Sequence, residues 1–77
     1  MYTIYSKPNC PFCDKAKMLL ELKGEEFETL TLGEDYEREY LMEHIFTNYG
    51  VMPRTMPQIV NGETYIGGYN ELKELLG

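Results

Sequence analysis

The first third of the chain changes from a strand-like to a helix-like pattern of apolar positions. Residues 2–6 carry aromatic and β-branched side chains and run into a Lys-Pro-Asn segment, which predicts a strand that leads into a loop. Over residues 11–23, apolar side chains recur at helical spacing, with Pro11 suited to the first turn and Gly24 to the end. Residues 27–32 alternate imperfectly between apolar and polar types and predict a second strand.

A second helix is expected over residues 34–48. Apolar side chains in this stretch occur in pairs four positions apart, Leu41 with Ile45 and Tyr36 with Tyr40. Gly50 follows, and glycine commonly ends helices because it adopts a left-handed backbone without strain. The pattern therefore predicts a helix that buries one face, followed by a loop over residues 51–56.

The last third of the chain carries the signals of a hairpin and a short helix. Residues 58–60 and 64–66 predict two short strands, because the Asn-Gly dipeptide between them favours a tight primed turn. A Gly-Gly pair then interrupts the chain. A final helix is expected after it, and its apolar face carries Leu72, Leu75 and Leu76.

The expected order of elements is β-α-β-α-β-β-α. A βαβ unit at the start implies a parallel strand pair, and the hairpin adds an antiparallel pair. We therefore expect an α/β fold with a four-stranded mixed sheet and three helices. With 77 residues, the chain is expected to form one domain over residues 1–77.

Composition and charge exclude several classes of function. Hydrophobic residues make up 43% and charged residues 26%, as in ordinary globular proteins. The net charge of -6 disfavours binding to nucleic acid, which requires basic patches. No apolar run approaches the ~20 residues of a membrane span, and the first residues do not resemble a signal peptide. We expect a cytoplasmic protein, in which cysteines rarely serve as structural crosslinks.

The Cys10-Pro11-Phe12-Cys13 motif is the strongest chemical signal, because it lies where a predicted strand meets a predicted helix. Backbone N–H groups and the helix dipole at a helix N-terminus stabilise an anion, and the thiolate is the attacking form of cysteine. Cys10 is expected to be the exposed nucleophile. Cys13, one turn into the helix, is expected to be the partly buried thiol that resolves a mixed disulfide. This placement predicts a thiol–disulfide oxidoreductase.

Other interpretations of the two cysteines are less favoured by the sequence. A zinc site needs four ligands, and the chain offers only Cys10, Cys13 and the distant His44. A structural disulfide closing so short a loop would restrain the unfolded chain little. A peptide-binding adaptor with inert cysteines remains a third alternative, and it predicts no turnover with any disulfide.

Three ordered motifs extend the evidence over nearly the whole chain. They are Tyr5 to Cys13 (YSKPNCPFC), Thr55 to Ile59 (TMPQI) and Ile66 to Leu72 (IGGYNEL). Together they resemble the glutaredoxin family, which has a thioredoxin-like fold, and the short length resembles the compact glutaredoxins of bacteria and bacteriophages. The resemblance implies a monomer without a permanently bound cofactor that reduces protein disulfides and glutathione mixed disulfides.

The resemblance also implies partners. Electrons would come from glutathione as co-substrate or from a thioredoxin-reductase-like flavoenzyme, and ribonucleotide reductase is one implied recipient. An alternative function within the family is an iron–sulfur cluster-binding module, in which two protomers hold the cluster through the first cysteine and glutathione. Pro11 and the presence of Cys13 favour redox chemistry over cluster binding.

Residue roles follow from the resemblance. Cys10 would attack and Cys13 would resolve. A cis Pro57 would turn the Met56 backbone toward the cysteines, while Lys7 and Arg54 would meet the glycyl carboxylate of glutathione. Backbone groups at the start of the last helix would hold the γ-glutamyl end. The residues expected at the substrate and glutathione site are Lys7, Phe12, Arg54, Thr55, Met56, Pro57, Gly68, Tyr69 and Asn70.

Three positions depart from the family pattern. Phe12 stands where tyrosine is frequent, and Met56 stands where the smaller valine is common. Asn70 stands where the family usually has aspartate. We expect Asn70 to serve equally well as a helix N-cap, but it lacks the negative charge that would attract the ammonium group of glutathione. The sequence therefore predicts weakened glutathione binding.

Overall fold

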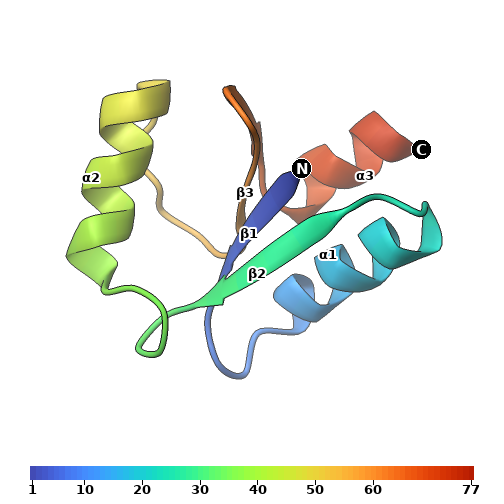
Figure 1. Ribbon diagram of the computed structural model, residues 1–77, viewed down its shortest axis with the longest axis horizontal. Helices are drawn as coiled ribbons and strands as arrows, with labels where there is room; N and C mark the ends of the chain where they lie inside the picture. Colours follow the sequence, from blue (N-terminus) through green and yellow to red (C-terminus); the bar gives the residue numbers. More distant parts are fainter.

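A four-stranded sheet separates two layers of helices in the computed structural model, which describes residues 1–77 (Figure 1). Helices α1 and α3 cover one face of the sheet and α2 covers the other. The elements in chain order are β1 (Tyr2–Ser6), α1 (Pro11–Leu22), β2 (Phe27–Thr31), α2 (Arg38–Tyr49), β3 (Gln58–Asn61), β4 (Thr64–Gly67) and α3 (Tyr69–Leu76).

The strand order is β2-β1-β3-β4, with β1 and β2 parallel and the pairs β1–β3 and β3–β4 antiparallel. This is the arrangement of the thioredoxin-like fold, so the expected fold class and element order are confirmed. The hairpin is also confirmed, but its turn lies one residue later than the Asn-Gly dipeptide suggests. Asn61 still pairs with Thr64 in the ladder, and Gly62, with a φ of 61°, takes the first turn position.

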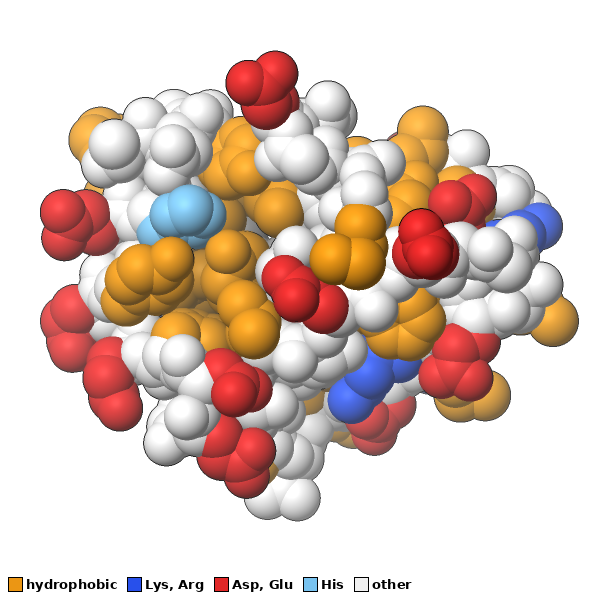
Figure 2. Space-filling view, in the orientation of Figure 1, with side chains coloured by type: hydrophobic (Ala, Val, Ile, Leu, Met, Phe, Trp, Pro, Cys, Tyr) orange, Lys and Arg blue, Asp and Glu red, His pale blue; other side chains and the backbone are white.

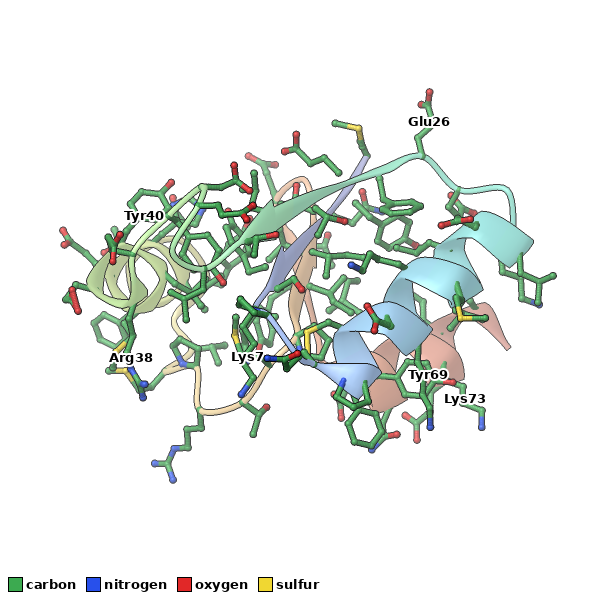
Figure 3. All side chains as sticks on the ribbon, turned by 90° about the horizontal axis from the view of Figure 1, so that it is seen from below. Lys7, Glu26, Arg38, Tyr40, Tyr69 and Lys73 are labelled. Carbon is green, nitrogen blue, oxygen red and sulfur yellow. A yellow bond between two sulfur atoms is a disulfide. The ribbon has the colours of Figure 1, made fainter.

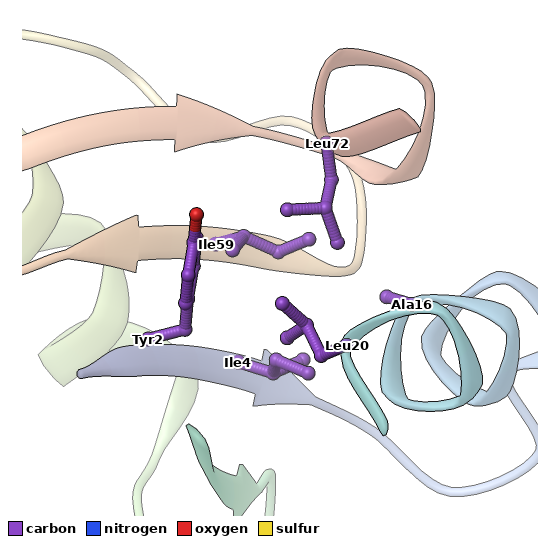
Figure 4. Close-up of a cluster of buried hydrophobic side chains, with 6 residues drawn as sticks. All are labelled: Tyr2, Ile4, Ala16, Leu20, Ile59 and Leu72. Atoms are coloured by element: carbon purple, nitrogen blue, oxygen red, sulfur yellow. The ribbon is translucent and has the colours of Figure 1, made fainter. Parts of the chain in front are cut away.

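The first hydrophobic core lies between the sheet and helices α1 and α3 (Figure 4). Side chains alternate between the two faces of a strand, so Ile4 of β1 and its cross-strand partner Ile59 of β3 point to the same side. Helical spacing brings Ala16 and Leu20 of α1 onto them. The cluster as a whole comprises Tyr2, Ile4, Ala16, Leu20, Ile59 and Leu72. It fixes α1, and with it the cysteine motif, against the sheet.

The second core lies on the opposite face, beneath α2. Tyr5 and Val60 are the strand neighbours of the first-core isoleucines and therefore point the other way. Leu41 and Ile45 of α2 pack on them, as their four-residue spacing predicts. The Tyr36 side chain completes the cluster.

Helix α2 begins at Arg38 and not at residue 34, so the predicted helix start was wrong. The Asp35 carboxylate accepts a hydrogen bond from the Thr31 N–H at 2.8 Å, and the Gly33 N–H donates to the Tyr36 carbonyl at 2.9 Å. Short acidic side chains compete in this way with helical hydrogen bonds. The buried Tyr36 hydroxyl also donates to the Ser6 carbonyl at 2.7 Å, which holds this residue in the turn.

Tyr36→Phe tests this anchor through alkaline unfolding. Removing the hydroxyl leaves the Ser6 carbonyl with only the Leu32 N–H as donor, at 2.9 Å, and the loss of one hydrogen bond should lower the free energy of unfolding by about 1 kcal/mol near neutral pH. Burial, with a smaller effect from Tyr5, raises the pKa of Tyr36 to about 12. The unfolded chain ionises from about pH 10, so stability due to this group is complete below that pH and is lost as the pH rises toward 12.

Urea unfolding midpoints of both proteins, measured near pH 7 and near pH 11, check this prediction. The wild type should lose more stability between the two pH values than Tyr36→Phe does. Equal losses would contradict the assigned role of Tyr36 in alkaline unfolding.

Candidate active site

The two cysteines form a disulfide at the N-terminus of α1, with Cα atoms 5.2 Å apart. Cys10 is the N-cap, and its Sγ accepts a hydrogen bond from the Cys13 N–H at 3.2 Å. Asn9, with a φ of 56°, turns the chain ahead of the helix, and Pro11 takes the first helical turn, where no N–H is needed. The expected position of the motif is therefore confirmed.

The two cysteines differ in exposure in the expected order. Cys10 is 7% exposed and Cys13 is fully buried. The prediction of an exposed Cys10 was nevertheless too strong, because the disulfide and the surrounding loops leave only an edge of this residue at the surface. Cys10 is thus the only one of the two cysteines with exposed surface.

Two aromatic rings flank the disulfide on one side. Phe12 is 51% exposed, and its ring centroid lies 6.0 Å from that of Tyr69. The Lys15 ammonium lies 5.1 Å from the Phe12 ring centroid, a cation–π arrangement. Figure 3 shows the disulfide at the start of α1, between Lys7 and Tyr69. The start of α1 and the start of α3 thus meet beside the reactive sulfurs.

The start of α3 lies against the loop that precedes β3. A Cβ atom placed on Gly68 would lie 3.6 Å from the Pro57 carbonyl oxygen, so the two segments nearly touch. Gly68 is the N-cap of α3, and its N–H donates to the Glu71 carboxylate at 2.8 Å. From the sequence, we expected Asn70 to be the N-cap, and this was wrong. Asn70 is an exposed residue in the first turn of α3.

The loop before β3 has the expected cis Met56–Pro57 bond. Gln58 holds this loop in place, a role that the sequence analysis did not anticipate. Its buried side-chain amide donates to the Thr55 carbonyl at 2.6 Å and accepts from the Tyr65 hydroxyl at 2.6 Å. A polar residue directly after the proline, where a strand enters the core, was the only sequence signal for this role.

A cavity of about 220 Å³ opens beside Lys7, which lies between β1 and the disulfide. Its walls come from the loops after β1 and β2, the start of α2 and the loop before β3, and they include no acidic residue. The lining residues are Lys7, Leu32, Arg38, Leu41, Met42, Pro53, Arg54, Thr55 and Met56. Lys7 and Arg54 were expected at the site, whereas Arg38 was missed.

His44, the third residue considered as a ligand beside the two cysteines, lies apart from them. No group of three or more His, Cys, Asp and Glu side chains is placed to hold a metal ion. His44 lies on α2 and stacks on the Tyr40 ring, with centroids 5.4 Å apart, instead of joining the cysteines. None of the helices combines the length and the apolar character that crossing a bilayer requires.

Comparison with known proteins gives consistent results. The glutaredoxin family model matches residues 2–66. Glutaredoxin 3 of Escherichia coli is 36% identical over 73 residues, which cover 94% of this chain and 81% of that protein. The hybrid peroxiredoxin hyPrx5 of Haemophilus influenzae is 41% identical over 73 residues, but they span only 27% of its length.

A solved structure agrees with the sequence matches. The crystal structure of a buckwheat glutaredoxin–glutathione complex superposes with a TM-score of 0.76 at 25% identity. The superposition covers 95% of this chain and 64% of the buckwheat chain.

Proposed function

Because the chain belongs to the glutaredoxin family of thiol–disulfide oxidoreductases, we propose that Cys10 attacks substrate disulfides and that Cys13 resolves the resulting mixed disulfide. The observation that carries this proposal is the position of Cys10 as N-cap of α1, with its sulfur accepting the Cys13 N–H. In the reduced protein the same N–H and the helix dipole would stabilise the Cys10 thiolate.

The proposed reaction proceeds by two sulfur exchanges. The Cys10 thiolate attacks one sulfur of the substrate disulfide and forms a mixed disulfide, and the other sulfur leaves as a thiolate that takes up a proton. Cys13, as its thiolate, then attacks the Cys10 sulfur and releases the second substrate thiol. Two electrons pass from the dithiol to the substrate, and the protein is left with the Cys10–Cys13 disulfide seen in the structure.

Glutathione is the proposed co-substrate, bound across the disulfide. Its glycyl carboxylate would enter the cavity beside Lys7, Arg38 and Arg54. Its cysteinyl backbone would pair with Met56, and its γ-glutamyl end would reach the N–H groups at the start of α3, beside Gly68, Tyr69 and Asn70. Thr55 and Phe12 would border the bound tripeptide. Two glutathione molecules would return the protein to its dithiol form, yielding glutathione disulfide.

Disulfide-containing proteins are the proposed substrates, and ribonucleotide reductase is the recipient that we propose first because of the likeness to small dithiol glutaredoxins. The reductant distinguishes two versions of the proposal. Glutathione would require the contacts just described, whereas a thioredoxin-reductase-like flavoenzyme would not. Rates of reduction of the oxidised protein by glutathione and by a thioredoxin reductase should therefore be compared.

Two substitutions test the glutathione version. Lys7→Ala should raise the KM for glutathione, since it removes a cation from the cavity. Asn70→Asp should lower it, because an aspartate would face the ammonium group of the ligand. Asn70 is exposed, and exposed ion pairs contribute only ~0.2–1 kcal/mol, so each change should be several-fold at most and should shrink as salt is added.

Steady-state kinetics with glutathione at low and high salt measure both effects. If neither substitution changes the KM at low salt, glutathione is not the reductant, and the flavoenzyme version gains support.

A further inference from the structure

The cavity beside the disulfide concentrates positive charge in a protein that is otherwise acidic. Three of the seven basic residues, Lys7, Arg38 and Arg54, line it, and none of the 13 acidic residues does. Acidic side chains are scattered over the face of the molecule drawn in Figure 2. The only ion pair in the structure joins Lys17 to Asp14 on α1. The three cations of the cavity therefore have no internal counter-charge.

The charge and the volume of this cavity exceed what glutathione would use. One glycyl carboxylate would face three cations. The cavity volume is about 220 Å³, and a cavity of ~150 Å³ already holds a benzene molecule. Part of the wall is apolar, formed by Leu32, Leu41, Met42, Pro53 and Met56. A carboxylate on a short methylene chain would match both the cations and this apolar wall.

We propose that this cavity selects acidic peptide substrates, in which an acidic residue directly follows the reacting cysteine. This inference rests on the proposed function, since the binding mode given above directs the residue after the substrate cysteine toward Lys7. The methylene groups of the acidic side chain lie on the apolar wall. Its carboxylate meets one arginine, and the other two cations remain for the C-terminal carboxylate of a short peptide.

The size of the selectivity follows from the strength of such contacts. Arginine binds carboxylates through two parallel hydrogen bonds, which are stronger than neutral ones. Lys7, Arg38 and Arg54 are all exposed, however, and exposed ion pairs contribute only ~0.2–1 kcal/mol. We expect one added carboxylate to raise the rate of reduction about 1.5- to fivefold at low salt, and the gain to fall as ionic strength increases.

Three tripeptides isolate the effect of charge from that of size. They are γ-Glu-Cys-Gly, γ-Glu-Cys-Gln and γ-Glu-Cys-Glu, each as a mixed disulfide with 2-mercaptoethanol. The second-order rate constant for reduction is measured with the reduced protein in single-turnover reactions. The glutamate peptide should react about 1.5- to fivefold faster than its uncharged glutamine isostere at low salt.

Variants assign the selectivity to the cavity. Arg38→Gln and Arg54→Gln should each lower the ratio of the glutamate to the glutamine rate constant, and a ratio cancels any loss common to both peptides. Lys23→Gln changes the net charge equally, at the C-terminal end of α1 and away from the cavity, and should leave the ratio unchanged. Thermal melting confirms that each variant is folded.

The outcomes separate this inference from the proposed function. If all three peptides react no faster than without protein, the proposed function fails. If the peptides are reduced but glutamate gives no advantage over glutamine, selection for acidic substrates is wrong. The same conclusion holds if the advantage survives in both arginine variants or is lost equally in Lys23→Gln.

Discussion

Cys10→Ser is expected to abolish the reduction of every disulfide substrate. Serine has nearly the same shape, but its hydroxyl is not ionised at neutral pH and cannot form a disulfide, so the first exchange step cannot occur. Cys13→Ser should lose dithiol reduction of protein disulfides. It should keep part of the activity on glutathione mixed disulfides, because free glutathione can take the place of the resolving thiol. This difference in activity between the two variants is the largest effect that the proposed mechanism predicts.

Two assays measure the asymmetry, one with a protein disulfide and one with a glutathionylated thiol, each run on both variants. Mass spectrometry of Cys13→Ser should also detect a glutathione adduct on Cys10. Both variants lack the disulfide, so each is the control for the other with respect to folding. Retained activity in Cys10→Ser would refute Cys10 as the nucleophile. If Cys13→Ser were inactive at the same time, the roles of the two cysteines would be exchanged.

The second large effect concerns the core beneath the active site. Leu20 is fully buried in the first core, whereas Leu22, two positions later on the same helix, is 82% exposed. Leu20→Ala should lower the free energy of unfolding by about 2–5 kcal/mol, because it removes buried methyl groups and leaves a cavity. Leu22→Ala should change it by less than about 0.5 kcal/mol. Small domains have only ~5 kcal/mol or little more to lose, so Leu20→Ala should be close to unfolding.

Urea unfolding at one temperature compares the two leucine variants. The substitution and the helix are the same for both, so the difference between them reports burial alone. Similar stability in the two variants would mean that α1 does not pack on the sheet as described.

The fold could be predicted from the sequence wherever one periodic pattern determined an element. Helix α1 and the strands of the sheet are such cases, because proline, glycine and alternating side chains mark their ends and faces. The start of α2 could not be predicted in this way. Tyr36 and Tyr40 have helical spacing, yet the Tyr36 hydroxyl donates to the carbonyl of Ser6 at the end of β1, a contact that no local pattern encodes.

The same distinction holds for the candidate site. The cysteine motif and the Thr55–Pro57 segment are contiguous and were visible in the sequence, as was the glycine pair ahead of α3. Arg38 reaches the cavity only because the sheet brings the start of α2 beside the loop after β1. Gln58 acts through Tyr65, on the adjacent strand of the hairpin. Both depend on tertiary packing, which a single sequence does not reveal.

The buried amide of Gln58 has a consequence for how a substrate would dock. It ties the Thr55 carbonyl to the Tyr65 hydroxyl, so the segment that ends at Pro57 is ordered when the chain folds and not when a ligand arrives. Ordering a flexible loop on association would consume part of the binding free energy as lost conformational entropy. In this protein that loss has already occurred on folding. The site is preorganised, so the contacts that a substrate makes with this segment contribute almost fully to the affinity of the substrate.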